Sequence, residues 1–257
     1  MTSQHSFHSL VQGGMEQVNQ VIRTCLSTDA VLVRQATEFM IASGQERIRP
    51  VVTLLAAGAL GYTGEPQYRL AAAVELIQGS LDLHNQVNDP GSEGGALGNA
   101  AEILLGDLLY TGAFKLIVGL GDMPVMRVLS DATNVIAEAE VRQRELGADL
   151  AYGSPAYVDL VRGRVAQLFS AATRCVGLLA GATAAVTDAL AAYGLHVGTA
   201  YQLWQESTEH GADGQAAQAM AREEAALASA ALALLKDSPS KTALRDYAQL
   251  VGEGGAE

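Results

Sequence analysis

The sequence predicts an all-α protein, a bundle of about ten helices folded as one domain over residues 1–257. Alanine and leucine are abundant, and aromatic residues make up only 5% of the chain. Nearly every apolar run between glycine and proline breaks has the length and period of a helix, whereas the strict alternation typical of strands is missing. With 257 residues, 49% of them hydrophobic, the chain is long enough to bury a large core.

Capping residues and helix breakers set the expected helix ends. Thr28 and Asp29 form a capping cluster before the second helix. Pro50 fits the first turn of the third helix, where a missing N–H costs little. Pro90 ends the fourth helix because proline cannot donate a hydrogen bond. The expected helices cover 5–25, 28–43, 47–60, 66–89, 96–119, 125–151, 156–180, 187–209, 215–236 and 241–251, separated by glycine-containing turns.

The net charge, the cysteine content and the distribution of apolar residues argue against several classes of protein. The formal net charge of −12 argues against a nucleic-acid partner, because such proteins present a basic face to phosphates. Cys25 and Cys175 are too few for a disulfide framework, and the N-terminus lacks the apolar segment of a signal peptide. The most apolar stretch, 175–192, is broken by polar residues, so no membrane span is expected. We therefore expect a soluble, cytoplasmic protein.

The fourth expected helix carries an unusual polar stripe. Gln78, Asp82, Asn85 and Asp89 follow one another at spacings of four, three and four, so they share one helix face. A polar stripe usually faces water. Here, however, amides stand where a solvated face would normally carry Glu and Lys, so a ligand-binding wall is the competing interpretation.

Four blocks of the chain carry a family resemblance. Residues 44–50, 72–78, 83–89 and 98–107 resemble successive motifs of the trans-isoprenyl diphosphate synthase (polyprenyl synthetase) family, in the same order and spacing. The similarity continues through 164–169, 198–202 and 237–241. The resemblance implies an isoprenoid-synthase-type helical bundle. It also implies a segment missing after about residue 210, where family members have further helices.

The resemblance further implies that the metal sites are degenerate. Active members hold magnesium ions between two Asp-Asp-x-x-Asp motifs, because the leaving diphosphate needs hard cations with anionic oxygen ligands. The positions that match the first motif are Asn85, Gln86 and Asp89, and those that match the second are Gln205, Glu206 and Glu209. We therefore expect no intact metal site, no catalytic residue and no cofactor. The alternative is residual magnesium held by Asp82, Asp89, Glu206 and Glu209.

The family has a second site, which binds the diphosphate of the other substrate, and the resemblance implies that this site is weakened here too. The residues that the resemblance assigns to residual diphosphate binding are Arg47, Arg49, Gln78 and Arg164. Glu46 replaces the lysine of the family pattern with the opposite charge, which disfavours an anionic ligand. A structural interpretation is equally open: the arginines cap or pair on a surface, and Gln78 satisfies a buried partner.

These observations lead to a function with two alternatives. We expect a catalytically silent homologue that serves as a non-catalytic or regulatory subunit of a heteromeric prenyl diphosphate synthase. The alternatives are a divergent, magnesium-dependent prenyltransferase or cyclase, and a binding protein for an isoprenoid ligand. The expected partner is an active synthase subunit or a second copy of this chain. Pairing is expected through Leu104, Leu108, Ala113 and Leu116 on one helix and Val128, Ala132, Val135 and Ala139 on the next.

Overall fold

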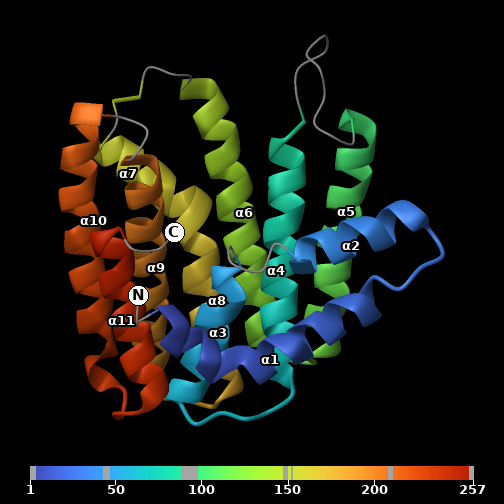
Figure 1. The fold of residues 1–257 in the computed structure, drawn as a ribbon, viewed down its shortest axis with the longest axis horizontal. Helices are drawn as coiled ribbons and strands as arrows, with labels where there is room; N and C mark the ends of the chain where they lie inside the picture. Colours follow the sequence, from blue (N-terminus) through green and yellow to red (C-terminus); the bar gives the residue numbers. More distant parts are fainter. Residues whose placement is uncertain are drawn as a thin grey trace.

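A computed structural model describes residues 4–42, 47–87, 98–146, 150–151, 153–207 and 211–254. Within these ranges every regular element is a helix and no strand occurs, which confirms the all-α prediction (Figure 1). The helices are α1 (Gln4–Cys25), α2 (Val31–Ala42), α3 (Ile48–Ala59), α4 (Pro66–Asn85), α5 (Asn99–Gly119), α6 (Met123–Leu146), α7 (Pro155–Val161), the π-helix η2 (Arg162–Ala166), α8 (Gln167–Leu179), α9 (Ala184–Ser207), α10 (Gly211–Ala231), the 3₁₀-helix η3 (Leu232–Leu234) and α11 (Pro239–Glu253).

The expected boundaries agree with the described helices to within five residues, and the largest differences are the end of α6 at Leu146 and the start of α10 at Gly211, where a loop was expected. Helix α2 begins at Val31, three residues later than expected, and Arg34 in its first turn donates to the carbonyl oxygen of Asp29 at 2.8 Å. The expected helix 156–180 is one continuous rod, but its middle is the π-helix η2. With that rod counted once, the described part of the chain has the predicted number of helices.

Helices α3, α4, α8 and α9 form the centre of the bundle. Their fully buried side chains include Leu55, Leu76, Phe169 and Tyr193. The hydroxyl of Tyr193 donates to the carbonyl oxygen of Leu244 at 2.8 Å, which ties α9 to α11. A buried aromatic ring stabilises a core through the large apolar area it buries, provided that its one polar atom is paired.

Small residues allow the last helices to pack closely on this centre. A Cβ atom added at Gly198 of α9 would lie 2.8 Å from the Cα atom of Ala166 in η2. On α10 a stripe of buried alanines faces the bundle; its members are Ala217, Ala221, Ala225 and Ala228. Helix axes approach closely only where side chains are this small, so glycine and alanine set the position of η2 between α9 and the rest of the bundle.

The expected pairing stripe is only partly exposed. Ala113, Ala132 and Ala139 are buried in this chain's own core, so that part of the prediction is wrong. Leu104, Leu108 and Val135 of the stripe are exposed, at 69%, 37% and 38% of their surface. Other large apolar side chains exposed on α5 and α6 are Ile103, Val118, Met123, Val141 and Leu146. Among the described residues, no helix combines the length and apolar character needed to cross a membrane.

Candidate functional site

A cavity of about 340 Å³ opens where α3, α4, α6, η2 and α9 converge. The residues that line it are Met40, Arg47, Arg49, Glu75, Gln78, Gly79, Leu81, Asp82, Asn85, Glu140, Arg164, Val165, Tyr201, Gln202 and Gln205. Five segments far apart in the sequence therefore bring three arginines, three carboxylates and four amides to one space. Polar side chains dominate this space, unlike the apolar lining of most small-molecule sites.

The polar stripe of α4 forms one wall of this cavity. Gln78, Asp82 and Asn85 all line it, so these three positions face a cavity, and their role in ligand binding stays a prediction. Gln78 Nε2 donates to Asp82 Oδ1 at 2.6 Å, so the two side chains of the stripe satisfy each other. Gln86 follows the last turn of α4 and is exposed outside the cavity, and Asp89 lies outside the described residues.

Arg47 is buried in the cavity wall and not spread on a surface. Its Nε donates to Glu75 Oε1 at 2.7 Å, and the two side chains are only 4% and 9% exposed. Its Nη1 donates to Asn19 Oδ1 at 2.6 Å, whereas its buried Nη2 has no partner among the described residues. Burial raises the pKa of the Glu75 carboxyl, although the charge of Arg47 opposes this shift.

Arg49 lies against an aromatic ring. Its guanidinium carbon is 4.6 Å from the centroid of Phe169, within the range of a cation–π contact. Burial lowers the pKa of Arg49, and the charge of Asp82 is the main opposing influence. The buried Nε has no partner in the described part of the chain. Arg47 and Arg49 thus both bring unsatisfied N–H groups to the cavity wall.

Glu140 of α6 connects three walls of the cavity. Its Oε1 accepts from Arg164 Nε at 3.0 Å and from Asn85 Nδ2 at 3.5 Å. Arg164 belongs to η2 and Asn85 to the end of α4, so one carboxylate joins α4, α6 and η2. Sequence reasoning missed Glu140, because its role depends on which helix packs opposite η2. Glu75, in contrast, precedes Gln78 by three residues and extends the same stripe.

The second degenerate motif contributes one amide to the cavity. Gln205 lines it, whereas Glu206 does not and instead accepts a hydrogen bond from Gln202. Glu209 lies outside the described residues. Within the described ranges, no three His, Cys, Asp or Glu side chains come together in a way that suits a metal ion. Asn85 and Gln205 supply no charge to offset the dehydration of magnesium, so the described residues do not fit a magnesium cluster.

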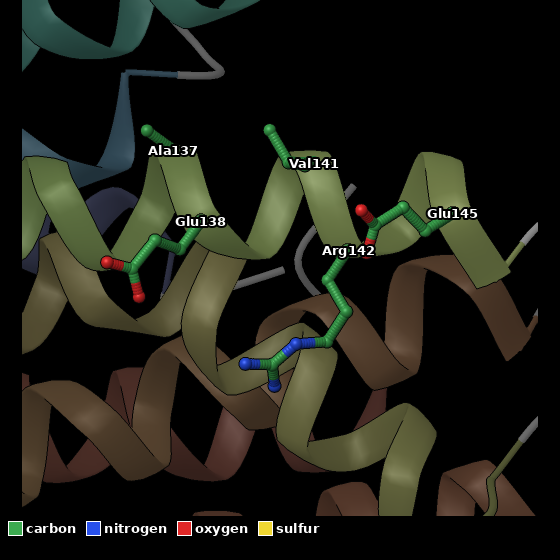
Figure 2. A pocket seen from close by; sticks show the side chains of 5 residues that line it. All are labelled: Ala137, Glu138, Val141, Arg142 and Glu145. Carbon is green, nitrogen blue, oxygen red and sulfur yellow. The ribbon is translucent and has the colours of Figure 1, made fainter.

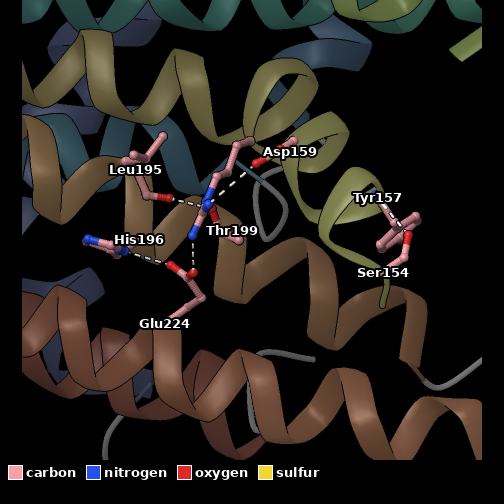
Figure 3. A network of polar contacts seen from close by, with 8 residues as sticks. Ser154, Tyr157, Asp159, Leu195, His196, Thr199 and Glu224 are labelled. Carbon is pink, nitrogen blue, oxygen red and sulfur yellow. Dashed lines mark hydrogen bonds and ion pairs between the residues drawn. The ribbon is translucent and has the colours of Figure 1, made fainter. Parts of the chain in front are cut away.

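A second polar cluster lies on the other side of η2 (Figure 3). Glu224 of α10 accepts from Arg162 Nη2 at 2.6 Å and lies 2.6 Å from His196 Nδ1. Asp159 is 3.6 Å from Arg162 Nη1. The π-helix therefore presents Arg162 to α10 and Arg164 to the cavity. π-helical turns inside α-helices occur frequently beside functional sites.

A shallow hollow on α6 carries no comparable chemistry. Figure 2 shows its five side chains, Ala137, Glu138, Val141, Arg142 and Glu145, and all of them come from the one helix. Because no second element closes over them, they form an exposed helix face and not an enclosed binding site. The cavity beside η2 is thus the candidate functional site.

Comparison with known proteins agrees with this geometry. The family model for polyprenyl synthetase matches residues 30–209. The chain belongs to the polyprenyl synthetase family. Within that family, octaprenyl diphosphate synthase of Escherichia coli (strain K12) is 37% identical over 215 residues, which are 81% of this chain and 67% of that protein. The enzyme of the same name from Haemophilus influenzae is 35% identical over 214 residues, 80% of this chain and 65% of its own length.

Solved structures of polyprenyl synthetase relatives share the fold. A polyprenyl synthase from Caulobacter crescentus CB15, complexed with calcium and isoprenyl diphosphate, superposes with a TM-score of 0.87 at 28% identity, covering 96% of this chain and 97% of that one. A decaprenyl diphosphate synthase from Rhodobacter capsulatus has a TM-score of 0.85 at 29% identity, covering 96% and 98%. The chain spans about two thirds of the length of the curated synthases that it matches.

Proposed function

We propose that this member of the polyprenyl synthetase family is a catalytically silent subunit that pairs with a prenyl diphosphate synthase and regulates it in isoprenoid biosynthesis. The observation that carries the proposal is the internal neutralisation of the cavity. Arg47 pairs with Glu75, Arg164 pairs with Glu140, and the negative charge of Asp82 acts on Arg49. A diphosphate would have to displace these carboxylates, which costs affinity.

The residues that match the two metal-binding motifs of the family support the same conclusion. Ionisation of an allylic diphosphate needs magnesium to take up the charge of the leaving group. Asn85 and Gln205 stand in the cavity where anionic ligands are required. The proposal therefore includes no resident cofactor and no catalytic residue. The same proposal includes a single domain over 1–257 that lacks a segment of the family after about residue 210. It also includes a cytoplasmic location.

Exposed apolar side chains on α5 and α6 support the pairing. Leu104, Val118 and Val141 are 69%, 59% and 58% exposed, and large apolar side chains left exposed on a folded protein are candidates for a contact surface. The proposed partner is an active synthase subunit, with a second copy of this chain as the partner when it is purified alone. An isoprenoid ligand, if one binds, would enter the cavity beside η2.

Co-purification tests the proposal directly. The chain is co-expressed with a synthase from the same cell, and the complex is assayed for magnesium-dependent elongation and for product length. Leu104→Asp should abolish pairing, whereas Leu234→Asp, at a side chain that is 60% exposed on η3, should not. A strictly monomeric protein that neither captures a synthase nor changes its products would refute the subunit role.

A divergent active prenyltransferase is the second candidate. Two observations favour it: the 37% identity to octaprenyl diphosphate synthase and the presence of Asp82 in the cavity. This candidate requires magnesium-dependent product formation by the purified chain alone. The activity should be lost in Asp82→Asn and retained in Asp188→Asn, which changes an exposed aspartate of α9. If neither the two variants nor the unchanged chain forms product, this candidate is excluded.

A further inference from the structure

Helix α2 is attached to the bundle by few buried contacts. All of its residues are described, and the one buried side chain among them is the polar Thr37. The hydroxyl of Thr37 donates to the carbonyl oxygen of Val33 in the same helix, at 2.7 Å. Phe39, Val31 and Leu32 are 77%, 58% and 39% exposed, so their apolar surface contributes little to holding α2 in place. Most of the stability of a helix in a protein comes from the packing of its apolar face, and α2 has little of this packing.

Local interactions do not compensate for the missing burial. Isolated helices shorter than about 12–15 residues are marginally stable in water, and α2 has 12 residues. Its first turn has no acidic residue and its last turn has no basic one, so no charged side chain complements the helix dipole. A bidentate ion pair between Arg23 and Glu38 ties α2 to α1, with N–O distances of 2.8 and 2.9 Å. The two side chains are 43% and 57% exposed, and exposure to water makes such a pair a weak attachment.

The inner side of α2 covers part of the candidate site. Met40 lines the cavity, and together with Val33 and Ile41 it is partly buried against the core. A Cβ atom added at Gly79 of α4, which also lines the cavity, would lie 3.1 Å from Sδ of Met40. The end of the Met40 side chain therefore lies over Gly79. Figure 1 shows α2 at the edge of the molecule, where it follows α1 through the short connection at 26–30. Outward movement of α2 would uncover Gly79 and widen the cavity.

From this combination we propose that α2 is a lid on the cavity. It detaches locally while the other helices stay folded, carries Met40 away from Gly79 and opens the cavity on the side of α4. Segments with few buried apolar contacts open most readily, and elements that cover ligand sites belong to this group. The pair between Arg23 and Glu38 holds the lid closed. The lid goes beyond the proposed function, because access to the cavity is a property of this chain whether it is silent or active.

Hydrogen exchange followed by mass spectrometry tests the local opening in the unchanged protein. The backbone amides of α2 should exchange at least about tenfold faster than the amides of 70–77, in the buried part of α4. Equal protection of the two segments would mean that α2 opens only when the whole chain unfolds, and this result would overturn the proposal.

Labelling of an introduced thiol tests whether the same opening uncovers the cavity. Gly79→Cys places a thiol beneath Met40, and its reaction with uncharged N-ethylmaleimide is followed on the peptide that contains residue 79, so the two native cysteines do not contribute. Glu38→Gln in this background should speed the reaction about twofold to fivefold, because it removes the ion pair that holds the lid.

Glu65→Gln in the same background is the matched control. Its pair with Arg69 has the same N–O distance of 2.8 Å and side chains that are 40% and 58% exposed, but it stands at the N-terminal end of α4, away from Gly79. The control should react at the rate of the background. If Gly79→Cys does not fold, the exchange of α2 in Glu38→Gln and Glu65→Gln alone gives the same comparison.

Two outcomes of this comparison overturn the lid. One is an equal rate for Glu38→Gln and Glu65→Gln. The other is faster exchange of the amides of 70–77 in Glu38→Gln, which would show global and not local opening. Both measurements use the chain alone and report neither pairing nor turnover, so the lid and the subunit role can fail separately.

Discussion

Substitution of Glu224 tests the polar cluster that joins α10 to η2. The side chain is 9% exposed and holds two partners at 2.6 Å, Arg162 and His196. Glu224→Gln keeps the volume of the side chain but removes the charge, and its NH₂ group cannot accept a hydrogen bond. One amide oxygen remains as an acceptor, so one of the two partners, Arg162 or His196, loses its acceptor.

The expected loss of stability follows from the exposure of the partners. Removing one member of a fully buried ion pair costs about 3–5 kcal/mol. The side chains of Arg162 and His196 are 37% and 22% exposed, so water can replace part of the lost interaction. We therefore expect a loss of about 2 kcal/mol, which corresponds to a fall in Tm of about 4–8 °C for a chain of this length.

Thermal unfolding followed by circular dichroism measures this loss. Glu223→Gln is the matched control, because Glu223 is the exposed neighbour on α10 and its substitution should change stability by less than about 0.5 kcal/mol. Equal Tm values for the two variants would show that the cluster contributes nothing to stability, and the reasoning from its geometry would be wrong.

The same variant has a defined pH dependence. Burial alone would raise the pKa of Glu224, but the hydrogen bonds from His196 and Arg162 outweigh it and the pKa is lowered. A carboxyl whose pKa is lower in the folded state stabilises the protein above its unfolded pKa, about 4.3, and loses that contribution as the pH falls through the folded pKa. The difference between Glu224→Gln and the unchanged protein should therefore persist at neutral pH and shrink below about pH 4.

Three other substitutions follow from buried or crowded positions. Glu102→Gln should raise the free energy of unfolding by about 1 kcal/mol in urea titrations, because both buried carboxylate oxygens lack a partner among the described residues; a lower midpoint would contradict this. Gly198→Ala should cost about 1–3 kcal/mol, because its Cβ would lie 2.8 Å from the Cα of Ala166, whereas Gly13→Ala, with open space around it, should be neutral or stabilising. Tyr193→Phe should cost about 1 kcal/mol by the same measurement, since its buried hydroxyl donates to a carbonyl of α11; no change would show that this bond is dispensable.

The helices were predictable because their ends are marked locally. Pro66, Pro155 and Pro239 each begin a helix, and proline is favoured there because its missing N–H has no partner to lose. The polar face of α4 was equally predictable, since Gln78, Asp82 and Asn85 needed only the helical period to fall together.

The pairings inside the cavity were not predictable in the same way. Glu140 binds Arg164 because α6 packs beside η2, and nothing in the local sequence of either helix records that packing. The π-helix was missed for a related reason: a shift of hydrogen bonding by one residue leaves no mark in composition. Close packing on small residues also escaped the sequence, because Gly163 becomes informative only when a Cβ there is seen to lie 2.9 Å from the Cβ of Ala139.

The π-helix η2 sets the angle by which α7 is rotated relative to α8. A π-helical turn holds one residue more than an α-helical turn, and this extra residue rotates α7 by about 100° around the axis that it shares with α8. Deletion of a single residue from η2, such as Gly163, would rotate α7 by this angle and carry Arg162 away from α10 while Arg164 kept its direction. The length of this one segment therefore fixes the angle between two cationic side chains, and a family member of different length here would have to pair one of them elsewhere.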